Sequence, residues 1–86
     1  MEKEIKYTKH VLKRASDRGV EIGEIEEVLM NEKCSEAKYG RLFASKIFSF
    51  NKVWEEKYYE QKEVIVIFKE ENGRIVVITT IARYFN

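Results

Sequence analysis

The hydrophobic pattern divides the chain into a helical first third and a strand-rich remainder. In residues 8–20, the apolar side chains of Val11, Leu12 and Ala15 are spaced to share one face of a helix. Residues 20–30 repeat this pattern with four aliphatic positions, namely Ile22, Ile25, Val28 and Leu29. Two consecutive amphipathic helices are therefore predicted, with glutamates on the outer face of the second.

Local signals mark the ends of these helices. Thr8 suits the N-cap position, because its hydroxyl can accept a hydrogen bond from a backbone N–H of the first turn. Gly19 suits the left-handed position just after the first helix, and Val20 is placed for the hydrophobic contact that follows. If Glu21 caps the second helix, Val20 and Ile25 can form a hydrophobic staple across its first turn.

The rest of the chain has the composition of β-strands. A strand is expected within residues 39–50, starting near Arg41. Residues 63–69 and 74–82 are apolar on both faces, which is typical of central strands. Asn72-Gly73 between them is the strongest short signal for a two-residue hairpin turn.

These elements predict an α+β domain that occupies residues 1–86. We expect two N-terminal helices packed on a C-terminal antiparallel sheet of three to four strands. Residues 2–7 fit either a brief edge strand or a lead-in to the first helix. Trp54, within the more polar residues 51–57, is expected to anchor this segment on the surface of the core.

Composition narrows the functional classes. The chain has 86 residues, of which 44% are hydrophobic, so one folded domain is expected rather than a disordered segment. The residues after Met1 are charged, which predicts a cytoplasmic protein without a signal peptide or membrane span. Cys34 and His10 are the only residues of their types in the sequence, so neither a disulfide nor a zinc cluster is expected, and no cofactor is predicted.

Charge is unevenly distributed, although the net charge is only +1. Residues 6–18 contain five Lys or Arg and one acid, whereas residues 21–32 contain five Glu and no base. Such a division polarises the surface and can attract an anion to one side. Enrichment in Glu and Lys over the whole chain is also a tendency of hyperthermophile proteins, although the absence of proline does not fit that interpretation.

A cationic stripe along the first helix is the main candidate for chemistry. His10, Arg14 and Arg18 recur at intervals of four residues, so they lie one helical turn apart along one side of the helix. This side borders the apolar face formed by Val11 and Ala15. The stripe predicts either a binding site for an anion or an ordinary solvated face.

Several motifs, in this order, resemble a widespread prokaryotic domain-of-unknown-function family. They are Tyr7-Thr-Lys-His10, Arg14, Arg18-Gly-Val20, Ile25-Glu-Glu-Val-Leu29, Lys62-Glu-Val-Ile-Val-Ile67 and Ile75-Val-Val-Ile-Thr-Thr-Ile-Ala-Arg-Tyr84. That family is grouped with the RelE/ParE/BrnT-like toxins, which are small α+β proteins. The resemblance implies a RelE-like fold and a role in a type II toxin–antitoxin module. Implied partners are RNA or the ribosome and an antitoxin protein, but no membrane, and a homodimer is left open.

The resemblance also implies metal-independent RNA cleavage, although relatives of the ParE type do not cut RNA. Such cleavage uses the substrate 2′-hydroxyl as the nucleophile, with a general base, a general acid and cations that stabilise the phosphorane. We assign proton transfer to His10 and phosphate binding to Arg14. Arg83 and Tyr84, near the end of the last strand, are also assigned to the catalytic site, where Tyr84 would donate a proton or stack on a base. Arg18 and Lys46 would bind RNA, Arg18 by holding the phosphate with Arg14 and Lys46 as a further cation.

Each of these residues also has a structural interpretation. His10 can donate a hydrogen bond to a backbone carbonyl, and Arg18 can tie the helix end to the sheet through hydrogen bonds. The aromatic residues Phe48, Trp54, Tyr58 and Tyr59 form either a nucleobase platform or part of the core. The functional alternative to an RNA endonuclease is therefore a non-catalytic interaction module that binds a partner protein.

Overall fold

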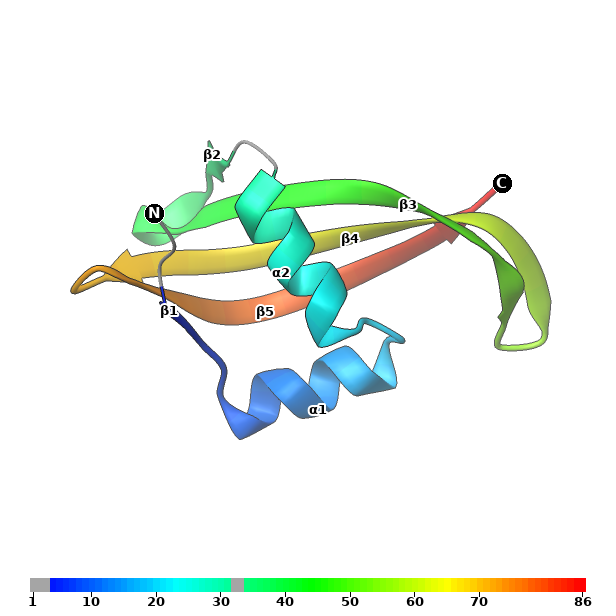
Figure 1. The fold of residues 1–86 in the computed structure, drawn as a ribbon, viewed down its shortest axis with the longest axis horizontal. Helices are drawn as coiled ribbons and strands as arrows, with labels where there is room; N and C mark the ends of the chain where they lie inside the picture. The colour runs from blue at the N-terminus through cyan, green and yellow to red at the C-terminus, as the bar shows by residue number, and fades with distance from the viewer. Residues whose placement is uncertain (1–3, 32–33) are drawn as a thin grey trace.

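The fold is taken from a computed structural model, which describes residues 4–31 and 34–86 (Figure 1). Two α-helices and five strands follow one another in the order β1, α1, α2, β2, β3, β4 and β5. Their bounds are β1 Glu4–Lys6, α1 Lys9–Asp17, α2 Ile22–Asn31, β2 Ser35–Glu36, β3 Leu42–Trp54, β4 Lys57–Glu71 and β5 Arg74–Phe85. A short 3₁₀ turn, Lys38–Gly40, precedes β3.

Helix α1 begins and ends where its capping residues predict. The Thr8 hydroxyl accepts a hydrogen bond of 3.1 Å from the backbone N–H of Val11, which confirms the N-cap. Gly19 has a φ of 75°, the left-handed conformation expected after the helix. The N–H of Val20 then donates to the carbonyl of Ala15 at 2.8 Å, which closes the helix end.

Helix α2 is capped by its own glutamates. The backbone N–H of Glu21 donates to Oε1 of Glu24 at 2.9 Å, which is one half of a capping box. Val20 and Ile25 are both buried in the core, in agreement with the predicted staple. The turn between α1 and α2 comprises only residues 18–21.

The five strands form one mixed sheet in the order β1-β5-β4-β3-β2. Strands β2 to β5 pair antiparallel with their neighbours, whereas β1 runs parallel to β5 with Ile5 beside Ile75. The predicted antiparallel sheet of three to four strands is therefore wrong, although the α+β class is correct. Strand β1 confirms the edge-strand interpretation for residues 4–6, and residues 2 and 3 lie outside the described part of the chain.

The missed strand β2 and the unpredicted parallel pairing of β1 have a physical explanation. Strand β1 has three residues and β2 has two, so neither is long enough to show a hydrophobic period. Residues of β1 pair with residues of β5 that are 70 positions away, and local sequence carries no information about such a pairing. In contrast, Asn72 and Gly73 form the predicted tight turn, with φ of 53° and 77°.

Strands β3 and β4 extend further than predicted and end in a second tight turn. Glu55 and Glu56 occupy this turn with φ of 51° and 74°, a conformation that side chains other than Gly and Asn rarely adopt. A β-bulge interrupts the β3–β4 pairing between Ser49 and Lys52. Beyond the bulge the hairpin curls away from the sheet (Figure 1), and we call residues 50–60 the arm.

Both helices cover the same face of the sheet, and the core lies between them and this face. Buried core residues are Val11, Ala15, Val20, Ile25, Val28, Ala44, Val64, Val66, Phe68, Ile75 and Val77. The alternate residues of the central strands point to the opposite face. We call that face the open face, and its central residues are Phe43, Ser45, Ile47, Ile65, Ile67, Thr79 and Ile81. In residues 4–31 and 34–86, no helix has the length and apolar character needed to cross a membrane.

Candidate functional site

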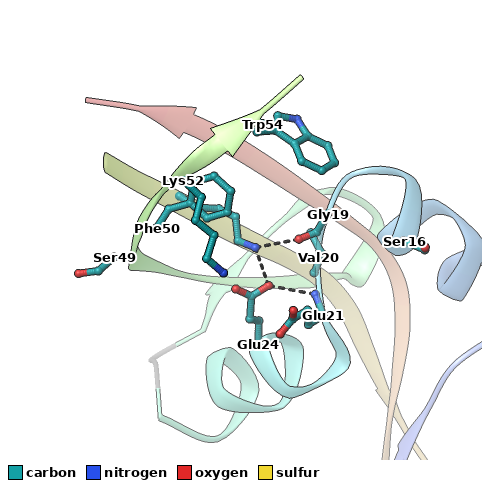
Figure 2. A pocket seen from close by; sticks show the side chains of 10 residues that line it. Ser16, Gly19, Val20, Glu21, Glu24, Ser49, Phe50, Lys52 and Trp54 are labelled. Atoms are coloured by element: carbon teal, nitrogen blue, oxygen red, sulfur yellow. Dashed lines mark hydrogen bonds and ion pairs between the residues drawn. The ribbon is translucent and has the colours of Figure 1, made fainter. Parts of the chain in front are cut away.

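A cavity of about 400 Å³ lies between the α1–α2 turn and the start of the arm (Figure 2). Its walls combine charged groups, two aromatic rings and backbone. The lining residues are Ser16, Gly19, Val20, Glu21, Glu24, Ser49, Phe50, Lys52, Trp54 and Lys62. Figure 2 shows Lys52 on the strand side and Glu24 on the helix side of this space.

Tyr84, near the end of β5, stands at the centre of an aromatic cluster beside the cavity. Its ring stacks on Trp54 with centroids 5.0 Å apart, and it also contacts Phe50 and Tyr59 at 5.2 and 5.6 Å. The Tyr84 hydroxyl donates a hydrogen bond of 2.7 Å to the backbone carbonyl of Arg18. Burial, followed by the negative charges of Glu24 and Glu55, raises the pKa of Tyr84 to about 12. The hydroxyl therefore remains protonated as a hydrogen-bond donor at neutral pH.

Gly19 lets the α1–α2 turn approach this aromatic cluster closely. A Cβ atom at this position would lie 2.5 Å from the Tyr84 hydroxyl oxygen and 2.7 Å from the Trp54 ring. Both distances are far below van der Waals contact. Gly19 is therefore required for its positive φ and also for the space it leaves to Tyr84 and Trp54.

Lys62 is a buried cation that was not among the predicted site residues. Its side chain is only 5% exposed, and its Nζ lies 2.8 Å from both the Gly19 carbonyl and Oε1 of Glu24. The ammonium also faces the rings of Phe50 and Tyr84 at 5.4 and 6.0 Å. The sequence did contain a signal, because Lys62 occupies the inward position of the alternation that continues through Val64 and Val66.

Arg18 joins the end of α1 to the sheet. Its guanidinium donates a hydrogen bond to the backbone carbonyl of Thr80 in β5. This is the contact that the structural interpretation of Arg18 expects. Arg18, Gly19, Lys62 and Tyr84 thus form one network that fixes the helical turn on the sheet, and most of its polar groups are already engaged within the protein.

The other residues of the cationic stripe lie elsewhere on α1. His10 and Arg14 are exposed. His10 is eight residues from Arg18, a separation of about 12 Å along the helix axis at 1.5 Å per residue. Because Tyr84 contacts the Arg18 end of the helix, the structure does not bring the imidazole of His10 and the phenol of Tyr84 together.

Arg83 and Lys46 point to different faces of the sheet. Arg83 lies on the face opposite to Tyr84, since successive residues of a strand alternate. Its guanidinium pairs with Glu63 of the neighbouring strand at 3.0 Å. Lys46 lies on the helix side, where its ammonium pairs with Glu27 of α2. Among the six predicted site residues, the Tyr84 hydroxyl and the Arg18 carbonyl form a direct contact between the α1–α2 turn and the sheet.

A second surface is the outer edge of β3. Strand β2 pairs only with Leu42 and Phe43, although β3 continues to Trp54. Within the described ranges, residues 44–49 therefore have no strand partner on their outer side, up to the bulge that ends the regular pairing.

The fold and these surfaces define a small α+β domain in which two helices cover one face of a five-stranded mixed sheet. A family model described as a domain of unknown function, DUF4258, matches residues 7–83, and the chain belongs to this family. The comparison with curated proteins gives no match, and neither does the comparison with solved structures.

Proposed function

We propose that this domain is a non-catalytic binding module that takes up an extended segment of a partner protein along the free edge of β3. The observation that carries the proposal is the six-residue stretch 44–49, an exposed strand edge without a neighbouring strand in the described structure. Such an edge presents unpaired N–H and C=O groups to solvent. Strand addition at an exposed edge is a common mode of peptide recognition.

Protection against unwanted pairing is weak along this edge. Natural edge strands are usually very short, charged, bulged or covered. Strands β1 and β2 are short, but β3 has 13 residues. Lys46, the charged residue within residues 44–49, is paired with Glu27 and so is largely neutralised. A nearly uncharged edge with regular pairing on its inner side is suited to a partner strand.

Charge indicates the chemistry of the partner. Residues 41–53 contain Arg41, Lys46 and Lys52 and no carboxylate. Arg41 and Lys52 are exposed at the two ends of the free edge. We therefore expect a partner segment with alternating apolar residues and acidic residues at its ends, because charge complementarity raises the association rate and selects the partner. If the resemblance to RelE/ParE/BrnT-like toxins extends to function, the partner is an antitoxin.

The proposal is tested with the product of the adjacent reading frame, co-expressed and purified with this domain. Amide hydrogen exchange of the complex should show new protection in residues 44–49, because their outward amides become hydrogen-bonded. Lys52→Glu should weaken binding about tenfold, which corresponds to about 1.4 kcal/mol. Lys69→Glu reverses the charge of another exposed lysine, which lies near the end of β4 and pairs with Glu71, and it should leave binding unchanged.

Two outcomes would contradict the proposal. One is a complex in which the newly protected amides lie in α1 or in β5 while those of residues 44–49 exchange as before. The other is an equal loss of affinity in Lys52→Glu and Lys69→Glu, which would indicate an unspecific effect of net charge.

A metal-independent RNA endonuclease is the second candidate function. The exposure of His10 and Arg14 on one side of α1 favours it, because both groups are accessible to a phosphate. This candidate predicts RNA products that end in a 2′,3′-cyclic phosphate without added metal, and growth arrest when the protein is induced. Both effects should be lost in His10→Ala. Intact RNA and normal growth with the wild-type protein would exclude it.

A further inference from the structure

We propose that the cavity between the α1–α2 turn and the arm binds a free amino acid with an aromatic side chain. This inference goes beyond the proposed strand pairing, which concerns the outer edge of β3. The cavity holds about 400 Å³. Binding sites for small molecules typically hold about 300 to 1,000 Å³, so this cavity lies at the lower end of the range. Its size suits a ligand with a single ring.

The buried pair of Lys62 and Glu24 leaves a free carboxylate oxygen on one side of the cavity. Oε1 of Glu24 is engaged twice, because it lies 2.8 Å from the Lys62 ammonium and accepts the backbone N–H of Glu21 at 2.9 Å. Oε2 has no hydrogen-bond or ion-pair partner in residues 4–31 and 34–86. The charge of Lys62 is thus compensated inside the protein, and Glu24 retains an acceptor for a donor in the cavity.

Two further charges lie on opposite sides of the cavity. Figure 2 shows Lys52 on the strand side and Glu21 with Glu24 on the helix side. Lys52 and Glu21 are exposed, and neither side chain forms an ion pair or a hydrogen bond within the part of the chain that the structure describes. The ammonium of Lys52 lies 5.7 Å from the centre of the Phe50 ring. One wall therefore offers a free cation, and the opposite wall offers a free anion.

Two aromatic rings complete the walls, and both are held in place without a ligand. Phe50 and Trp54 line the cavity, and both contact the ring of Tyr84, with centroid distances of 5.2 and 5.0 Å. Tyr84 is itself fixed by its hydrogen bond to the Arg18 carbonyl. Because these rings are already positioned, a ligand ring that packs against them loses little free energy to reorganisation of the site.

The charges specify a ligand that is a zwitterion. Its α-carboxylate pairs with Lys52, and its α-ammonium pairs with Glu21 and with Oε2 of Glu24. The lining contains two lysines and two glutamates, so a ligand of zero net charge leaves no group uncompensated. A simple anion would leave Glu21 without a partner, and a simple cation would leave Lys52 without one. The end of a peptide fits less well, because an N-terminal residue has no α-carboxylate and a C-terminal residue has no α-ammonium.

Titration of the isotopically labelled chain with L-phenylalanine, followed by amide chemical shifts in NMR spectra, tests this inference. The sample contains no partner protein, so the result is independent of the proposed strand pairing. We expect saturable shifts at the amides of Gly19, Val20 and Phe50, with a dissociation constant of about 1 mM or lower. Phenethylamine and phenylpropanoate each lack one of the two charges, and each should bind at least about fivefold more weakly.

Exposed single substitutions assign the two charges to the two walls. Lys52→Gln should weaken phenylalanine binding about fivefold and leave phenethylamine binding unchanged, because the amine has no carboxylate to lose. Glu21→Gln should weaken phenylalanine binding by a similar factor and leave phenylpropanoate binding unchanged. Lys57→Gln is the matched control, since Lys57 is an exposed lysine of the arm that does not line the cavity, and its affinity should equal that of the wild type.

Three results would overturn the inference. The first is the absence of shifts around the cavity up to about 20 mM phenylalanine. The second is binding of phenethylamine or phenylpropanoate as tightly as phenylalanine, which would identify the occupant as a chain end of a protein or as a simple ion. The third is an equal loss of affinity in Lys52→Gln and Lys57→Gln. The amide spectrum of each variant also establishes that it is folded.

Discussion

Gly19→Ala should destabilise the domain far more than Gly73→Ala, although the two glycines have the same backbone conformation. Gly19 and Gly73 have φ of 75° and 77°, so an alanine at either position costs about 1 to 2 kcal/mol of backbone strain. At Gly73 the added Cβ meets no atom within 4 Å. At Gly19 it would lie 2.5 Å from the Tyr84 hydroxyl oxygen and must displace that side chain or the turn.

The additional cost at Gly19 follows from the contacts that would be lost. The hydrogen bond from Tyr84 to the Arg18 carbonyl contributes about 1 kcal/mol. Disturbed stacking of Tyr84 on Trp54 contributes about 1 kcal/mol more. We therefore expect a total loss of about 3 to 4 kcal/mol for Gly19→Ala, against about 1 to 2 kcal/mol for Gly73→Ala. For a small domain that is only 5 to 15 kcal/mol stable, roughly, such a difference is large.

Urea denaturation measures both variants under the same conditions. Circular dichroism is the appropriate signal, because the fluorescence of Trp54 would itself respond to a change at Gly19. The reasoning is refuted if Gly19→Ala and Gly73→Ala lower the free energy of unfolding by the same amount. The close approach of the turn to Tyr84 and Trp54 would then make no contribution to stability.

Three further substitutions and a titration test other parts of the structure. Glu24→Gln should lower the free energy of unfolding by about 3 kcal/mol, because it leaves the Lys62 ammonium buried without its carboxylate partner. Urea denaturation measures this change. A loss below about 1 kcal/mol would show that the Gly19 carbonyl alone satisfies Lys62. The double variant Glu55→Asn/Glu56→Gly should stabilise the domain by about 1 to 2 kcal/mol, because Asn and Gly adopt the positive φ of this turn more readily. An unchanged or lower melting temperature would contradict this. Tyr84 has a folded pKa of about 12 against an ordinary value of 10.0, so its contribution to stability is complete below pH 10 and is lost as pH rises toward 12. Burial also raises the pKa of Tyr7, so ultraviolet absorbance should show late-titrating tyrosines, and the one that titrates near pH 12 should be missing in Tyr84→Phe. Identical titration curves would refute the assignment.

The parts of the fold that the sequence predicted are those decided by local chemistry. Thr8 and Gly19 end a helix by contacts within a few residues, and Asn72-Gly73 forms a turn by its own backbone preferences. The Glu55-Glu56 turn could not be found in this way, because glutamate has no preference for positive φ. Strand β1 was assigned only as an edge or a lead-in, and its parallel pairing depends on residues near the other end of the chain.

The candidate site shows the same contrast between features that local sequence determines and features that depend on distant contacts. Helical periodicity places His10 and Arg14 one turn apart on α1, and Arg18 follows as the C-cap residue of this helix. It does not determine what each side chain contacts, and Arg18 is bound to a carbonyl of β5. For Arg83 and Tyr84, the alternation of side chains along a strand is sufficient by itself to separate them onto opposite faces of the sheet.

The pairing of β1 with β5 has a consequence for synthesis on the ribosome. Strand β1 emerges first, and the segment that completes its hydrogen bonds emerges only after β2, β3 and β4. The two helices and the β3–β4 hairpin need only residues that precede Arg74, whereas the parallel edge must wait for Arg74–Val76. Nascent chains stalled before Arg74 should therefore remain sensitive to proteolysis near Ile5, and chains released after Phe85 should become resistant there.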